Sequence, residues 1–128
     1  MPQQIRIFHC DDSAAFTRLV SHWLDEHADI EHVGAAHSGD DAVAAIGSSR
    51  PDVVLLDTMG SPCDTSLLRR IRSQVPQARV IVYSGYVSLL EEGALGAEAD
   101  AYIEKGDDDD ALVAMIRAVA ASGAIRKP

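Results

Sequence analysis

Short runs of hydrophobic, mostly β-branched residues recur at regular intervals along the chain. They are Ile5 to Cys10, Ile30 to Ala35, Val53 to Leu56, Val80 to Tyr83 and the shorter Ala101 to Ile103. Runs of this length and composition are typical of β-strands. The central runs are apolar at nearly every position instead of at alternate ones, which is typical of a parallel sheet covered on both faces. The pattern therefore predicts five strands in one buried parallel sheet.

The segments between these runs carry helical patterns. Helices are predicted after the N-cap residue Ser13, after the turn-like pair Ser38-Gly39, from Leu67 to Val75, around Val87 to Leu95, and from the acidic run Asp107 to Asp110 onward. Strands that alternate with helices through short connections favour right-handed crossovers. The chain is therefore predicted to be an α/β protein of the flavodoxin-like kind, an open parallel five-stranded sheet with helices on both faces.

Length and composition agree with one domain. A chain of 128 residues with 47% hydrophobic residues can bury its own core, and we expect a single domain over residues 1–128 with a core at about 4–122 and no room for an output domain. The net charge of -9 argues against direct binding of nucleic acid, and the longest apolar runs are too short to cross a membrane. Cys10 and Cys63 form no CxxC pair, so we expect free thiols in a cytoplasmic protein.

Polar residues stand where the predicted strands end. They are Asp11 and Asp12 after the first strand, Asp57 after the third, Ser84 after the fourth and Lys105 after the fifth. Ligands of an open α/β sheet bind beyond these carboxyl ends. Three carboxylates at one edge repel one another unless a cation lies among them, and their oxygen atoms suit Mg²⁺. A lysine and a hydroxyl beside them suit a phosphoryl group, with Asp57 as the attacking nucleophile.

This set of residues resembles the response-regulator receiver family, and the resemblance spans essentially the whole chain. The stretch 96–106 (GAEADAYIEKG) is similar to the branch of receivers often joined to helix-turn-helix output domains. The resemblance implies that Asp57 is the phosphoacceptor, Asp12 a direct ligand of Mg²⁺ and Asp11 a ligand acting mainly through water. It further implies that Met59 gives its backbone carbonyl to the metal. One departure is the loop after Asp57, where Gly60 and Ser61 stand in place of the usual Met-Pro.

The resemblance also implies how the chain signals. Ser84 would hydrogen-bond the phosphoryl group, Lys105 would pair with it, and Tyr102 would turn inward as part of the switch. The donor would be a sensor histidine kinase or phosphotransfer protein. A downstream effector would read the face formed by the fourth helix, the fifth strand and the last helix. A homodimer is compatible with the family, although no residue pattern indicates one. The chain would catalyse only its own phosphorylation and dephosphorylation.

Each residue also has an ordinary explanation when taken alone. Asp11 and Asp12 can cap a helix, and Tyr102 can simply pack on an edge strand. His9 is expected to be buried and hydrogen-bonded. A dehalogenase-like phosphatase would need an aspartate where Met59 stands, and a flavin or nucleotide binder would need a glycine-rich or hydroxyl-rich loop in place of the Asp11-Asp12 pair. The alternative that remains open is a receiver-like interaction module that signals without phosphorylation.

Overall fold

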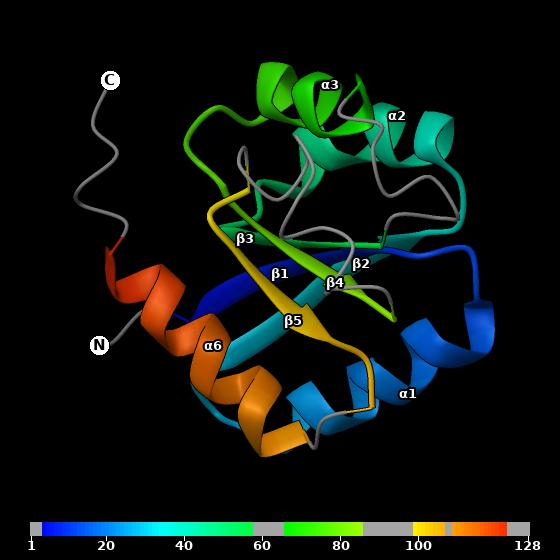
Figure 1. The fold of residues 1–128 in the computed structure, drawn as a ribbon. Coiled ribbons are helices and arrows are strands. Elements are labelled where there is room, and N and C mark those ends of the chain that lie inside the picture. The colour runs from blue at the N-terminus through cyan, green and yellow to red at the C-terminus, as the bar shows by residue number, and fades with distance from the viewer. Residues whose placement is uncertain (1–3, 58–65, 86–98, 107–108, 123–128) are drawn as a thin grey trace.

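A five-stranded parallel sheet forms the centre of the molecule (Figure 1). The computed structural model describes residues 4–57, 66–85, 99–106 and 109–122. Its strands are β1 (Ile5–Cys10), β2 (Ile30–Ala36), β3 (Val53–Leu56), β4 (Arg79–Ser84) and β5 (Ala101–Glu104), in the order β2-β1-β3-β4-β5. All four pairings are parallel, as predicted. The strand ends differ from the predicted ones by a residue at most.

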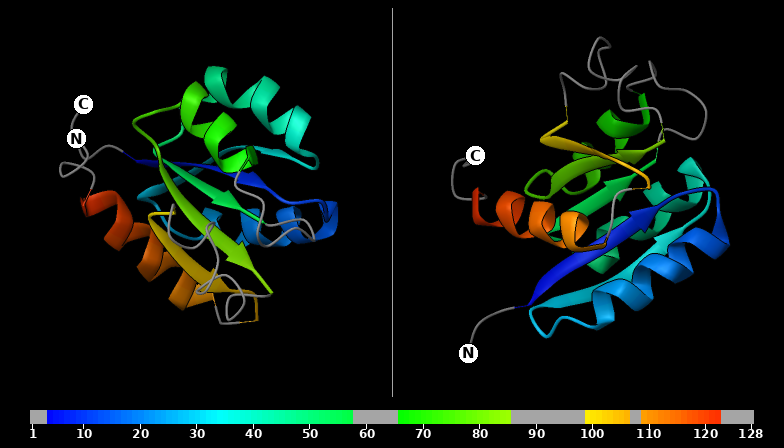
Figure 2. Two further views of the ribbon diagram at one scale, coloured as in Figure 1. Left: turned by 45° about the horizontal axis from the view of Figure 1, so that its top comes forward. Right: turned by 60° about the horizontal axis from the view of Figure 1, so that its bottom comes forward.

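Helices cover both faces of the sheet (Figures 1 and 2). They are α1 (Ala14–Asp25), α2 (Gly39–Ser49), α3 (Ser66–Gln74) and α6 (Asp109–Ala121). The α2 and α3 helices lie on one face, and α1 and α6 lie on the other. The helix predicted from Val87 to Leu95 lies outside the described residues. No helix in the described part of the chain is long and apolar enough to cross a membrane.

Alternate residues of the same strand fill two separate cores. Phe8 and Val54 belong to the core under α2 and α3, whereas their neighbours Ile7 and Leu55 belong to the core under α1 and α6. All four are buried. Because side chains of a strand alternate between faces, a strand covered on both sides must be apolar at every position. This explains the uninterrupted hydrophobic runs of the sequence.

A β-bulge in β2 changes which face its side chains meet. Ile7 pairs with His32, but the next residue, Phe8, pairs with Gly34. One extra residue of β2 therefore reverses the alternation. Ile30 packs into the core under α1, while Ala36, an even number of residues later, packs into the core under α2. The sequence pattern did not reveal this bulge.

Two serines cap the first two helices. The Ser13 cap was predicted from the sequence, whereas Ser38 was expected only as part of a turn before the second helix. Ser13 Oγ accepts a hydrogen bond from the backbone N–H of Phe16 at 3.1 Å, and Ser38 Oγ accepts one from Asp41 at 3.2 Å. These bonds satisfy amides that have no partner within the helix. The α2 helix ends at Arg50, whose φ of 49° is left-handed, immediately before Pro51.

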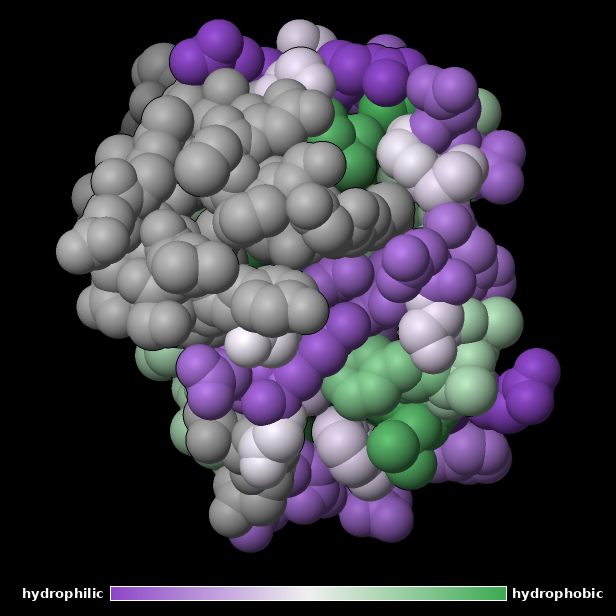
Figure 3. Space-filling model, turned by 45° about the vertical axis from the view of Figure 1, so that its right-hand side comes forward, coloured by the Kyte–Doolittle hydropathy of each residue, from purple (hydrophilic) through white to green (hydrophobic). Residues whose placement is uncertain are grey.

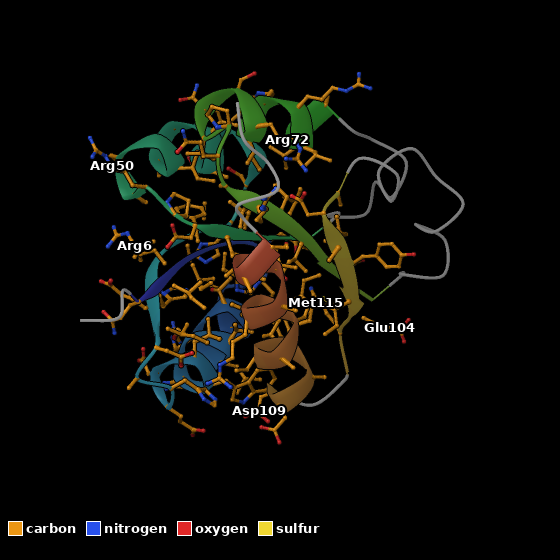
Figure 4. All side chains as sticks on the ribbon, turned by 90° about the vertical axis from the view of Figure 1, so that its left-hand side faces the viewer. Arg6, Arg50, Arg72, Glu104, Asp109 and Met115 are labelled. Carbon is orange, nitrogen blue, oxygen red and sulfur yellow. The ribbon has the colours of Figure 1, made fainter. Side chains whose placement is uncertain are left out.

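Charged side chains join three elements at the amino end of the sheet. Asp100 Oδ2 accepts hydrogen bonds from the backbone N–H of Val80 at 2.8 Å and from Arg72 on α3 at 3.1 Å. Arg79 Nη1 lies 3.8 Å from Asp100 Oδ1, and its Nη2 donates to the carbonyl of Ser122 just beyond α6 at 2.9 Å. Figure 4 shows Arg72 and α6 on opposite sides of the sheet. Asp100 therefore links α3 directly, and the end of α6 through Arg79, from the two sides of the sheet.

Candidate functional site

The polar residues predicted from the sequence lie together at the carboxyl edge of the sheet. Backbone hydrogen bonds align the ends of neighbouring strands. The N–H groups of Asp11, Asp57 and Lys105 donate to the carbonyl oxygens of Ala36, Cys10 and Ser84, at 3.0, 2.9 and 2.8 Å respectively. Because β1, β3, β4 and β5 are neighbours in this order, residues far apart in sequence meet at one edge.

Three carboxylates form an acidic cluster at this edge. Asp11, Asp12 and Asp57 each offer one oxygen, and these oxygens lie within 4.8 Å of one another. Asp11 is fully buried, Asp57 is 8% exposed and Asp12 is exposed. Grouped carboxylate oxygens are the ligands that Mg²⁺ prefers, so this donor set fits that ion. Met59, the fourth predicted ligand, lies outside the described residues.

Lys105 faces the acidic cluster. Its Nζ lies 2.6 Å from Asp11 Oδ2 and 3.4 Å from Asp57 Oδ1. Burial by itself would lower the pKa of this lysine, but the contacts with Asp11 and the negative charge of Asp57 outweigh it and raise the pKa. Lys105 is therefore protonated at neutral pH, and its ammonium offsets part of the carboxylate charge.

Ser84 and Tyr102 occupy different environments. Ser84 ends β4 and is fully buried. Tyr102 on β5 pairs in register with Val82 and is partly buried against the core under α2 and α3. These positions are compatible with the predicted switch, but they do not test it.

An aromatic group that sequence reasoning did not connect to the site lies beside Lys105. The Lys105 Nζ lies 4.6 Å from the centroid of the Phe16 ring. Phe16 also contacts the rings of Tyr83, His9 and Trp23, at centroid distances of 5.4, 5.9 and 6.4 Å. The helical spacing of Phe16 correctly indicated a residue that faces the core. Its contact with a lysine 89 positions later has no signal in the sequence.

His9 is buried, as expected, but the expected hydrogen bond is absent. Among the described residues neither ring nitrogen has a hydrogen-bond partner, and Nε2 lies 3.8 Å from Asp11 Oδ2. Burial lowers the pKa of His9 to about 4, against a smaller opposing effect of Asp11. The ring is therefore neutral near pH 7. Burial also raises the pKa of the neighbouring Cys10 to about 12, so this free thiol stays protonated.

Some hydrophobic side chains of the described residues reach the surface. In the space-filling view, hydrophobic side chains reach the surface in separate groups, one in the lower half of the view and another near its top, between hydrophilic regions (Figure 3). Leu19 of α1, at 45% exposed, is the exposed large hydrophobic residue of the described chain.

Comparison with known sequences gives a consistent result. The profile of the response regulator receiver domain matches residues 7–117. The protein-glutamate methylesterase/protein-glutamine glutaminase 1 of Syntrophus aciditrophicus is 30% identical, over 95% of this chain and 37% of that protein. The response regulator protein VraR of Staphylococcus aureus is also 30% identical, over 79% of this chain and 49% of VraR. The chain spans less than half the length of these two relatives.

Solved structures agree with the sequence comparison. The response regulator domain of Thermotoga maritima CheB superimposes with a TM-score of 0.78 and is 26% identical, with 93% of this chain and 98% of that chain covered. The receiver domain of AraT from Geobacillus stearothermophilus gives a TM-score of 0.76 at 25% identity, with 95% of each chain covered. These likenesses confirm the predicted flavodoxin-like fold. The chain belongs to the response regulator receiver domain family, the signalling domains of two-component systems.

Proposed function

We propose that this chain is a phosphoacceptor receiver in which Asp57 takes a phosphoryl group from a sensor histidine kinase or a phosphotransfer protein. The observation that carries the proposal is the position of the Lys105 ammonium, 2.6 Å from Asp11 and 3.4 Å from Asp57, within a cluster of three carboxylates. A cation beside a nucleophilic carboxylate can stabilise the negative charge of a phosphoryl group that is transferred to it.

Asp11, Asp12 and Asp57, with the backbone carbonyl of Met59, would hold Mg²⁺. When bound, this ion supplies positive charge that offsets the charge of the carboxylates and of the phosphoryl oxygens. The fit rests on the spacing of the carboxylate oxygens, which lie within 4.8 Å of one another. Mg²⁺ usually keeps several water ligands in addition to carboxylates. Asp12 is exposed, so such waters can reach the site.

Three residues of the chain have separate roles in the transfer step. A carboxylate oxygen of Asp57 attacks phosphorus, so that an O–P bond forms while the P–N bond to the donor histidine breaks. Lys105 pairs with the phosphoryl oxygens, and Ser84 donates its hydroxyl proton to one of them. Asp57 is only 8% exposed, which limits the access of water to the product.

The signal would pass from Ser84 and Tyr102 to a downstream effector. The effector face would comprise β5, α6 and the segment from Val87 to Leu95, in a single receiver domain of residues 1–128 that works in the cytoplasm. We expect Ser84→Ala to accept a phosphoryl group but to lose the phosphate-dependent change in effector affinity. Equal effector affinity of the wild type with and without phosphate would contradict this switch.

The first experiment is intact-mass spectrometry after incubation with Mg²⁺ and either acetyl phosphate or phosphoramidate. We expect one phosphoryl adduct in the wild type, none in Asp57→Asn and none when Mg²⁺ is removed. Asp25→Asn, at the exposed end of α1, is the matched control and should behave like the wild type. No adduct from either donor would favour the alternative, an interaction module that signals without phosphorylation.

A further inference from the structure

We propose that Phe16 is a positioning residue for Lys105, whose ammonium it holds over its aromatic face and directs toward Asp57. The effect on transfer rate rests on the proposed function, whereas the contact itself does not. The ammonium lies 4.6 Å from the ring centroid, inside the distance of about 6 Å at which cation–π attraction is significant. The lysine side chain is only 24% exposed, so water screens this attraction weakly.

The Phe16 ring is fixed from several sides. Its backbone N–H is bound by the N-cap Ser13, which places Phe16 in the first turn of α1. Its ring packs edge-on against His9 and Trp23, at interplanar angles of 72° and 88°. A ring held by its helix start and by neighbouring rings presents a surface that does not move with the lysine.

Lys105 needs such a surface because its side chain is flexible and its carboxylate partners are several. The lysine side chain rotates about four bonds, and confining it costs up to about 2 kcal/mol in conformational entropy. The acidic cluster includes the exposed Asp12 as well as Asp11 and Asp57, so attraction alone does not select one partner. The ammonium contacts the Phe16 ring while it lies 2.6 Å from Asp11 and 3.4 Å from Asp57, so the ring restricts the lysine in the position from which it reaches these two carboxylates. Because the ammonium is already confined before the reaction, less conformational entropy is lost when Lys105 pairs with the transferring phosphoryl group.

The contact can be measured directly by NMR. The chain has two lysines, Lys105 and Lys127, so lysine labelled with ¹³C gives two side-chain signals, and Lys127 serves as the internal reference. An aromatic face shifts protons above it upfield, so we expect the ε-protons of Lys105 to lie upfield of those of Lys127. Phe16→Leu should remove this difference, and Phe16→Tyr should keep it.

Trp23→Leu is the matched control. Trp23 lies on the same helix and in the same aromatic group, 6.4 Å from Phe16, but its ring is not the one that Lys105 contacts. Loss of this ring should lower stability and change the Lys105 signal much less than Phe16→Leu does, because Phe16 keeps its contacts with His9 and Tyr83. An unchanged Lys105 signal in Phe16→Leu, or an equal change in Trp23→Leu, would overturn the proposal.

A graded variant series separates cation–π attraction from packing. Fluorination of the ring at residue 16 weakens its negative face with little change of shape. From mono- to trifluorophenylalanine we expect the Mg²⁺-dependent transfer rate from phosphoramidate to fall stepwise, by about three- to ten-fold in total. Trifluorophenylalanine at Phe8, which is buried in the opposite core, should leave the rate unchanged.

The outcomes distinguish this inference from the proposed function. If the wild type takes no phosphoryl group, the proposed function fails, and the lysine signals still decide whether Phe16 holds Lys105. If the wild type is phosphorylated but the rate does not follow the number of fluorine atoms, the positioning role fails and the proposed function stands. The fluorinated variants keep the test valid even if Phe16→Leu does not fold.

Discussion

Lys105 and the proposed Mg²⁺ would share the same carboxylates. Its ammonium already contacts Asp11 and Asp57, two of the three proposed ligands of Mg²⁺. Charges a few ångströms apart near a protein surface interact by several kcal/mol. We therefore expect the lysine that would assist the phosphoryl group also to weaken the affinity of the proposed site for Mg²⁺.

We predict that Lys105→Met binds Mg²⁺ about ten-fold more tightly than the wild type, because the carboxylates lose a competing positive charge. Trp23, the single tryptophan, contacts Phe16 and can report the titration by fluorescence. Lys105→Arg keeps the charge and should bind Mg²⁺ with an affinity close to that of the wild type. Unchanged or weaker affinity in Lys105→Met would show that the lysine does not oppose the metal.

His9 makes stability depend on pH. Its pKa falls from 6.5 to about 4 on folding, so the unfolded chain binds a proton more readily than the folded chain. The contribution of neutral His9 to the free energy of unfolding is therefore fully present above pH 6.5. It is lost as the pH falls toward 4, by up to about 3 kcal/mol. His32, whose pKa burial also lowers, acts in the same direction.

We expect His9→Leu to be less sensitive to acid than the wild type when urea unfolding is compared at pH 7, 5.5 and 4.5. His22→Gln, at an exposed position of α1, is the control and should keep the pH dependence of the wild type. The carboxylates titrate in both proteins, so the difference between them isolates His9. Parallel stability curves for His9→Leu and the wild type would contradict the role of this histidine.

At the scale of elements, Gly34 in the bulge of β2 lies close against a core side chain. A Cβ at Gly34 would lie 3.1 Å from two carbons of the Phe8 ring, which is 1% exposed and enclosed by the core under α2 and α3. Such a contact is too short unless the ring moves, and a close-packed core resists that movement.

We predict that Gly34→Ala lowers the free energy of unfolding by about 1 to 3 kcal/mol, as overpacked cores do. Gly85→Ala is the control, because a Cβ there meets nothing within 4 Å. The double variant Gly34→Ala/Phe8→Leu should lose less free energy of unfolding than the sum of the losses of the two single variants, because the smaller Leu side chain removes the clash. Strictly additive costs in urea unfolding would argue against the clash.

At the scale of the whole molecule, Asp100 connects the two helical layers through the sheet. It binds Arg72 of α3 and the backbone of β4, and it lies beside the buried Arg79, which in turn binds the end of α6. Removal of Asp100 would leave the charge of the buried Arg79 poorly compensated.

We predict that Asp100→Ala lowers the free energy of unfolding by about 2 to 4 kcal/mol. Asp40→Ala removes an exposed ion pair with Arg70 and should cost less than about 1 kcal/mol. Chemical unfolding of both variants measures the difference. A cost for Asp100→Ala as small as that for Asp40→Ala would show that the network does not join the layers.

The sequence by itself determined the fold class and the membership of the carboxyl edge. Uninterrupted apolar runs such as Val53 to Leu56 require cover on both faces, and parallel strands place Asp11, Asp57, Ser84 and Lys105 at one edge. The Ser13 N-cap was also predicted correctly, because a helix start depends on neighbouring residues alone.

Only the tertiary structure decided how side chains distant in sequence meet. The bulge opposite Phe8, the ring of Phe16 beneath Lys105 and the missing hydrogen bond of His9 have no local pattern. Each depends on the register of neighbouring strands and on how α1 packs against the sheet. Spacing along a chain reports which face a residue occupies, whereas its partner across that face is set by the packing of the whole domain.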